Sequence, residues 1–251
     1  MGSPFFMAEM ISLELFLKGW MALAVITFIY LLQRAAPYGR HTQTGWGPTL
    51  PNRWGWVLME GIVLVSFWLA FSLNINSLYD IQPQVWILVA LFNLHYIHRS
   101  FVFPFCLKTT GKHMPWAIAG SAILFNLVNG TAMGQTFAEP QLTLPSWPVF
   151  GLGCLLFCAG QVINLYHDYH LISLRKPGET GYILPEKGLF RWIWAPNLWG
   201  EMVAWGGFAC MAGTLATTAF FVWTLANLVP RALAHAKWYR KKFPSAAPRW
   251  F

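Results

Sequence analysis

Seven apolar runs, separated by short polar stretches, dominate the pattern of this chain. They lie at 11–33, 54–74, 84–106, 115–135, 147–170, 197–213 and 214–236. About 20 helical residues cross the hydrocarbon core of a bilayer, so runs of this length are typical of membrane spans. The sixth and seventh runs merge, and their boundary is the least distinct. The pattern predicts an all-α, polytopic integral membrane protein, built as a bundle of seven transmembrane helices.

Composition agrees with a membrane protein of one domain. Only 10% of the 251 residues are charged and 56% are hydrophobic, whereas soluble domains carry about 25% charged residues. The first run lacks the basic start and the clear cleavage site of a signal peptide, so we expect it to be retained as a span. No internal repeat or second domain is visible, and 1–251 is expected to form a single membrane-embedded domain.

The basic residues indicate how the chain is oriented. Sixteen of the 17 Lys and Arg residues fall at alternate ends of the runs, and Lys18 is the exception. The stretches at 75–83 and 136–146 contain none. Under the positive-inside rule this pattern predicts an N-terminus outside and a C-terminus in the cytosol. A bacterial inner membrane and an endoplasmic reticulum membrane both satisfy the rule. The net charge of +8 therefore indicates topology rather than a nucleic-acid partner.

Polar residues at helical spacing interrupt three of the runs near their predicted cytosolic ends. Residues three or four apart share a helix face, and ionisable groups at membrane depth usually face the protein interior at a functional site. These three stripes favour a large polar ligand that enters from the cytosol. That the groups simply satisfy one another remains the alternative. The stripes are Asn164, Asp168 and Arg175; Asn197 and Glu201; and Arg231, His235 and Tyr239.

A second polar group lies in the earlier runs. Glu60 is surrounded in sequence by Trp, Leu and Met, and Tyr96 lies in the polar segment at 94–99. An apolar setting favours the neutral form of a carboxyl, and a neutral acid, like a phenol, donates a hydrogen bond. Glu60 and Tyr96 together are therefore suited to polarising a carbonyl oxygen. A purely structural hydrogen bond from Glu60 to a neighbouring helix is the alternative.

Several other site classes lack their sequence signals. The four cysteines lie in apolar runs without CxxC spacing, so we expect neither a disulfide nor a structural metal. The HxxH pairs at His95 and His98 and at His167 and His170 are not part of a larger histidine cluster, so no metal is expected. No glycine-rich nucleotide motif follows a strand pattern. Any nucleotide would have to be bound by helix faces and loops.

Ordered sequence blocks from residue 37 to the C-terminus closely resemble the steroid 5α-reductases, the 3-oxo-5α-steroid 4-dehydrogenase family. The Leu-Arg-Lys-Pro-Gly-Glu block at 174–179, followed by the Asn-x-x-Gly-Glu block at 197–201, is a specific combination. The matching blocks lie at 37–42, 50–53, 94–99, 164–169, 174–179, 188–190, 195–201 and 231–239. One departure is Met59, where the mammalian enzymes have Gln before the acid, and it bears on steroid preference.

The resemblance implies NADPH-dependent reduction of the C4–C5 double bond of a 3-oxo-4-ene steroid, or a similar enone lipid, to the 5α product. It implies that Glu60 and Tyr96 hold the ketone oxygen. Spans 1–4 would form mainly the substrate side, and spans 5–7 with the cytosolic loops the NADPH side. We expect Lys112, with Arg175 or Arg231, to balance the phosphates. The resemblance assigns the nucleotide pocket to Asn164, Asp168, Arg175, Tyr182, Asn197, Glu201, Arg231, His235 and Tyr239.

Other functions remain as alternatives at this stage. An NADPH-dependent reductase of another sterol or polyprenol double bond would keep the cofactor and change the substrate. The related isoprenylcysteine methyltransferases use S-adenosylmethionine in a C-terminal membrane pocket. A non-catalytic lipid-binding protein or transporter is a third class, but repeated halves and broken helices, which are typical of transporters, are not visible. The expected partners are the apolar substrate and membrane lipids, without a nucleic acid, a metal or an obligate protein partner.

Overall fold

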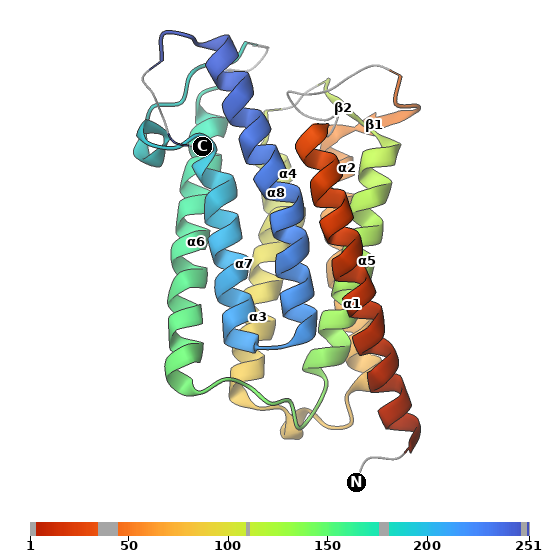
Figure 1. Cartoon of the computed structure of the whole chain (residues 1–251). Helices are drawn as coiled ribbons and strands as arrows, with labels where there is room; N and C mark the ends of the chain where they lie inside the picture. Colours follow the sequence, from red (N-terminus) through yellow and green to blue (C-terminus); the bar gives the residue numbers. More distant parts are fainter. Residues whose placement is uncertain (1–3, 35–44, 109–110, 176–180, 247–249, 251) are drawn as a thin grey trace.

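A computed structural model describes residues 4–34, 45–108, 111–175, 181–246 and 250. The sequence block 37–42 and the last four residues of the block 174–179 lie outside these described residues. The described part of the chain is mostly helical, as expected, and seven long helices form one bundle (Figure 1). They are α1 (Pro4–Gln33), α2 (Asn52–Asn74), α3 (Pro83–Ile97), α5 (Trp116–Phe137), α6 (Trp147–Ser173), α7 (Pro196–Ala212) and α8 (Leu215–Lys242).

Five of these helices are long and apolar enough to cross a membrane. α3 reaches this length because a π-helical turn, His98–Val102, and the short α4, Phe103–Cys106, continue it. α7 has only 17 residues, and the last turn of α8 is strongly basic. The crossing of the membrane by all seven helices, and their orientation, therefore stay predictions. The five segments are Ser12–Gln33, Asn52–Asn74, Pro83–Cys106, Trp116–Phe137 and Trp147–Ser173.

The merged sixth and seventh runs are separated at the boundary that the sequence predicted. Gly213 adopts a left-handed backbone conformation, with φ of 62°, and ends α7. Thr214 then caps α8, since its side-chain oxygen accepts a hydrogen bond from the Thr217 N–H at 3.3 Å. Glycine after a helix and threonine before one are the residues that these positions favour.

A small two-stranded sheet departs from the all-α prediction. β1 (Thr49–Pro51) pairs antiparallel with β2 (His113–Pro115). Each strand has three residues and ends in proline, so neither shows the alternating pattern by which strands are recognised. Both are edge strands, where proline is tolerated. The sheet joins the connection before α2 to the connection before α5.

Glycine residues bring two pairs of helices into close contact. A Cβ added at Gly160 of α6 would lie 2.3 Å from the Ala204 nitrogen of α7. A Cβ added at Gly134 of α5 would lie 2.3 Å from the Phe67 carbonyl oxygen of α2. Small residues allow the backbones of membrane helices to approach each other. The pairs α6–α7 and α2–α5 are therefore tightly packed units.

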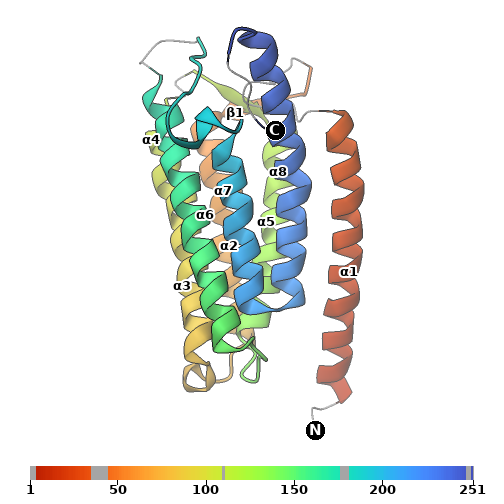
Figure 2. The same cartoon turned by 60° about the vertical axis from the view of Figure 1, so that its left-hand side comes forward.

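An aromatic core joins these pairs through α3. The Phe92 ring of α3 lies 5.2 Å from the Phe67 ring of α2 and 6.0 Å from the Trp205 ring of α7. On the periphery, α1 packs along α8 through Trp20 and Trp223, whose ring centres are 4.6 Å apart. Figure 2 shows α1 at the edge of the bundle beside α8.

One end of the bundle collects the segments that carry most of the basic residues. The end of α1, the sheet, the segment between α6 and α7, and the end of α8 all lie opposite the chain's N-terminus (Figure 1). We call this end the basic end. Its last-turn residues on α8 are Arg240, Lys241 and Lys242. The alternation of basic segments along the sequence thus becomes one charged face in space.

Candidate active site

Arg99 lies at the centre of the buried polar residues. It belongs to the π-helical turn His98–Val102. Such turns are rare in proteins, but those that occur are frequently found at functional sites. Its Nη1 atom donates to Asp168 Oδ2 of α6 at 3.1 Å, and its Nη2 atom lies 3.8 Å from Glu201 Oε2 of α7. Only 8% of Arg99 is exposed. A charge so deeply buried requires this pairing with carboxylates.

Two aromatic rings hold the Arg99 guanidinium from another side. Its Cζ atom lies 4.6 Å from the Phe103 ring centre and 5.1 Å from the Trp56 ring centre, within cation–π distance. Phe103 begins α4 and Trp56 belongs to α2. Arg99 therefore connects α2 and α4 to carboxylates on α6 and α7.

The polar side chains of the α6 and α7 stripes form hydrogen bonds with one another. Asn197 Nδ2 donates to Asp168 Oδ1 at 2.7 Å. Asn164 Nδ2 donates to the Asn197 carbonyl oxygen at 3.0 Å and lies 3.4 Å from Glu201 Oε2. Asn197 follows Ala195, whose φ of 55° is unusual for a residue other than glycine, and Pro196, which begins α7. This turn places Asn197 at the start of the helix, beside Asp168.

The two residues expected to hold a ketone lie beside the same arginine. Tyr96 is 4% exposed, with its ring 4.9 Å from Phe92 and 5.9 Å from Trp205. Tyr96 interacts electrostatically with Glu60 and Arg99. Glu60, which is half-buried on α2, also interacts with Arg99. Arg99 therefore pairs with the carboxylates of one polar group and interacts electrostatically with the residues of the other.

Arg231 of α8 also interacts with the buried polar residues around Arg99. It interacts electrostatically with both Glu60 and Asp168. His235 and Tyr239 follow on the same helix at one-turn intervals toward the basic end. Tyr239 is buried and stacks on Trp194, with ring centres 5.4 Å apart and planes 13° apart. The α8 stripe thus runs from the buried centre to the aromatic residues of the basic end.

A second cluster forms at the basic end itself. The Lys112 amine and the Arg175 guanidinium lie 6.0 Å and 5.6 Å from the Tyr182 ring centre. Tyr182 in turn contacts Trp238 of α8 edge to face, with ring centres 4.8 Å apart. Partial burial and the nearby Arg175 lower the pKa of the Lys112 amine below its ordinary value. Two cations and two aromatic rings are therefore adjacent.

The continuous helical stripe predicted from Asn164 to Arg175 was wrong at its end. α6 stops at Ser173, so Arg175 is not on the helix. Its carbonyl oxygen instead accepts a hydrogen bond from Lys108 Nζ at 2.6 Å. Arg175 therefore lies beside the Tyr182 ring at the basic end rather than on the α6 stripe.

Arg99 is the main residue whose role the sequence analysis missed. It was interpreted as a topology signal at the end of the third run. The signal that distinguishes it is its place inside that run, three residues after Tyr96. An arginine at such depth needs carboxylate partners, and Asp168 and Glu201 were already recognised as buried acids.

Three of the four histidines in the HxxH pairs, His95, His98 and His167, form hydrogen bonds through their rings. His95 Nδ1 lies 2.8 Å from Gln161 Nε2, and His98 Nε2 lies 2.9 Å from the Tyr169 hydroxyl. His167 Nε2 accepts from the Leu189 N–H at 2.9 Å, which attaches the 187–191 segment to α6. Across the described ranges, no group of three or more His, Cys, Asp or Glu residues is placed to hold a metal ion.

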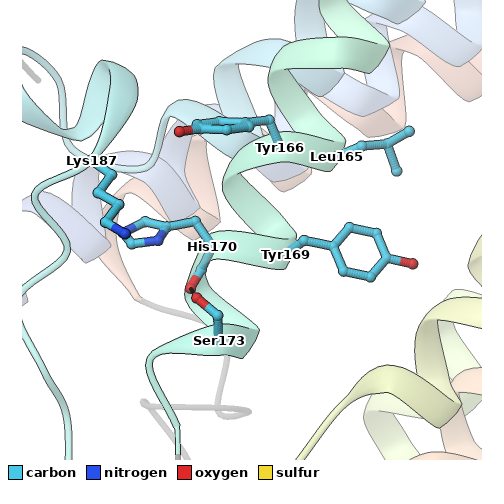
Figure 3. A pocket seen from close by; sticks show the side chains of 6 residues that line it. All are labelled: Leu165, Tyr166, Tyr169, His170, Ser173 and Lys187. Atoms are coloured by element: carbon cyan, nitrogen blue, oxygen red, sulfur yellow. Dashed lines mark hydrogen bonds between the residues drawn. The ribbon is translucent and has the colours of Figure 1, made fainter.

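A shallow groove of about 370 Å³ lies on a different face of α6 (Figure 3). With 100° between successive helical residues, the face of Asn164 and Asp168 is turned away from that of Tyr166 and His170. The groove is therefore separate from the buried polar centre. It is lined by Leu165, Tyr166, Tyr169, His170, Ser173 and Lys187.

Comparison with known proteins identifies relatives of this chain. Residues 112–249 match the profile of the family described as 3-oxo-5-alpha-steroid 4-dehydrogenase. Steroid 5-alpha-reductase DET2 of Gossypium hirsutum is 35% identical over 234 residues, which cover 90% of each chain. 3-oxo-5-alpha-steroid 4-dehydrogenase 1 of Bos taurus is 36% identical over 227 residues, or 88% of each. The Homo sapiens protein of the same name is 33% identical over 214 residues, covering 84% of this chain and 82% of the relative.

Proposed function

This chain belongs to the 3-oxo-5-alpha-steroid 4-dehydrogenase family, and on that premise we propose that it reduces the C4–C5 double bond of a 3-oxo-4-ene steroid, or of a similar enone lipid, to the 5α product with NADPH. The relatives are named for this oxidoreductase activity or as steroid 5-alpha-reductases. The single observation that supports it best is the position of Arg99. Arg99 interacts electrostatically with Glu60 and Tyr96, and it also pairs with the Asp168 carboxylate.

Glu60 and Tyr96 are proposed to polarise the ketone. The Tyr96 hydroxyl and the acid form of Glu60 are both hydrogen-bond donors. Negative charge develops on the ketone oxygen as the β-carbon accepts a hydride, and the α-carbon then takes a proton from solvent or a nearby acid. Donors placed beforehand around that oxygen stabilise the enolate-like charge, most strongly where water is excluded. The burial of Tyr96 and its proximity to Glu60 suit this role.

The residues present fit a nicotinamide dinucleotide. Asn164 Oδ1 is buried and, among the described residues, has no hydrogen-bond donor, so an amide N–H of the ligand would satisfy it. The buried part of the dinucleotide would also be bound by Asp168, Asn197, Glu201 and Arg231. A bound NADPH supplies the hydride.

The outer part of the dinucleotide is assigned to the basic end. Lys112 and Arg175 carry the positive charge that phosphates require. Tyr182 offers a flat ring beside both cations. His235 and Tyr239 continue the proposed site along α8 from Arg231. The proposed dinucleotide therefore extends from the buried centre to the surface.

We also propose seven membrane crossings, with the N-terminus outside and the basic end in the cytosol. The gathering of basic segments at one end supports this orientation. α1, α2, α3 and α5 would form mainly the substrate side of the single domain, and α6, α7 and α8 the cofactor side. The apolar substrate would enter from the bilayer, either of a bacterial inner membrane or of the endoplasmic reticulum.

The test is to incubate purified protein with NADPH and a 4-ene-3-one steroid. We expect loss of the reduced-nicotinamide absorbance and a product with 5α stereochemistry. A sterol with an isolated double bond is assayed in parallel, and reduction of that compound alone would replace the proposed substrate class. Binding of S-adenosylmethionine in place of NADPH would contradict the proposal altogether.

A further inference from the structure

Asn126 is a buried amide of α5 that lies beside Glu60. It is 3% exposed, and its Nδ2 atom donates to the Met59 carbonyl oxygen of α2. Its side chain also interacts with the Glu60 carboxyl. Within the described part of the chain, Asn126 Oδ1 is buried without a hydrogen-bond partner. No other described side chain therefore forms a hydrogen bond with this amide.

The packing of α5 on α2 determines where this amide lies. Asn126, Gly130 and Gly134 follow one another at one-turn intervals, on one face of α5. A Cβ at Gly130 would lie 2.7 Å from the Val63 carbonyl oxygen of α2. This close backbone approach leaves Asn126 little freedom to move away from Glu60, one turn of α2 before Val63.

The Met59 side chain packs among apolar residues. Met59 is buried in an apolar cluster with Leu50, Met114 and Ala119. Its backbone carbonyl accepts the hydrogen bond from Asn126. On the α5 side, Asn126 contributes a polar side chain that interacts with the Glu60 carboxyl.

The same arrangement occurs in the other glycine-packed pair. Asn164 lies one turn after Gly160 on α6, and its Nδ2 atom contacts the Asn197 carbonyl oxygen and the Glu201 carboxylate of α7. In both pairs, an asparagine beside the glycine contact meets a backbone carbonyl and a glutamate of the partner helix. A recurring geometry of this kind is suited to fixing the orientation of a carboxyl group.

We propose that Asn126 is a positioning residue, which fixes the Glu60 carboxyl in the orientation that polarises the substrate ketone. The proposal rests on the proposed function of Glu60. Asn126 acts through Glu60 and is not assigned contact with the reacting atoms. A residue that only attached α5 to α2 through Met59 would instead affect stability, whatever the state of Glu60.

The variants Asn126→Ala and Asn126→Leu both remove the amide, and the second also fills its volume. Asn129→Ala is the matched control, because Asn129 is equally buried on α5 but donates to Phe125 of its own helix at 2.7 Å. We expect both Asn126 variants to lower kcat about 10- to 100-fold, as misplacement of a catalytic group by about 1 Å does. NADPH binding, followed by nicotinamide fluorescence, should stay unchanged.

The decisive measurement is a double-mutant cycle with Glu60→Leu, which removes every polar atom of the side chain. If Asn126 acts through Glu60, Asn126→Ala causes little further loss of kcat in the Glu60→Leu background. Equal losses in both backgrounds would overturn the positioning role, as would Asn126 variants that behave like the Asn129 control. If Glu60→Leu itself turns over at the wild-type rate, the proposed function of Glu60 fails first. The two failures are thereby distinguished.

Discussion

Arg99 Nη1 donates to Asp168 Oδ2 at 3.1 Å and so joins the π-helical turn after α3 to the C-terminal part of α6. The two residues are 69 positions apart in the chain. Because both side chains are almost fully buried, removal of either leaves the other charge without its partner in an apolar bundle. The pair is therefore a structural requirement as well as part of the proposed site.

Arg99→Ala should strongly destabilise the protein. Breaking a buried ion pair commonly costs about 3–5 kcal/mol, and here Glu201 also loses its cation. Thermal unfolding in detergent measures the effect. Lys18→Ala is the control, because the Lys18–Glu14 pair is exposed and such pairs contribute about 0.3–0.5 kcal/mol. Equal midpoints for the two variants would contradict a buried, essential pair.

Glu60→Leu and Tyr96→Phe should each lower kcat about 100- to 1,000-fold, as loss of an oxyanion donor does. Tyr96→Phe retains the ring contacts with Phe92 and Trp205, so the fold should be preserved. Steady-state assays with an enone, together with NADPH titration, separate turnover from cofactor binding. The exposed Tyr30 of α1 provides the control variant Tyr30→Phe. A variant of Glu60 or Tyr96 that keeps wild-type turnover would remove that residue from the proposed mechanism.

Asn197→Ala should weaken NADPH binding. It removes the 2.7 Å hydrogen bond that orients Asp168. Hydrogen bonds to charged groups contribute about 1.5–3 kcal/mol, so we expect the KM for NADPH to rise about tenfold or more. Asn227→Ala is the comparison, because Asn227 donates only to Trp223 of its own helix. The assignment of Asn197 to the cofactor side would be withdrawn if both variants bound NADPH alike.

Gly160→Ala should weaken the packing of α6 against α7 and so destabilise the protein. The added methyl group would lie 2.5 Å from the Gly200 carbonyl oxygen, which is backbone and cannot yield by a rotamer change. Overpacking of this kind costs about 1–3 kcal/mol. Gly151→Ala on the same helix meets nothing within 4 Å and should leave the unfolding temperature unchanged or raise it. The reverse order of the two midpoints would be inconsistent with this helix contact.

Lys112 should make NADPH binding sensitive to alkaline pH. Because partial burial and Arg175 lower its pKa, the amine loses its charge at a lower pH than an ordinary lysine. The KM for NADPH should therefore rise as the pH increases toward the ordinary lysine value. Lys112→Arg keeps its charge over this range and should remove that limb of the profile. Identical pH profiles of the KM for wild type and Lys112→Arg would contradict a role for Lys112 in phosphate binding.

The helices were the most predictable part of the structure. Apolar runs are local signals, and the last two helices separate at the predicted boundary between runs 197–213 and 214–236, where Gly213 ends α7 and Thr214 caps α8. The sheet was missed because three-residue strands have no periodic signal, and their pairing depends on segments 64 positions apart.

The sequence by itself determined the helical membrane fold, the family and which polar side chains had to be buried, because hydrophobic length and motif order are properties of the chain alone. Only the tertiary structure decided which of those polar groups meet. Arg99 became the centre because a π-helical turn directs it between Asp168 and Glu201, and Asn126 reached Glu60 because glycines allow α5 to approach α2. Such contacts join residues distant in sequence and depend on how helices pack, which no local pattern records.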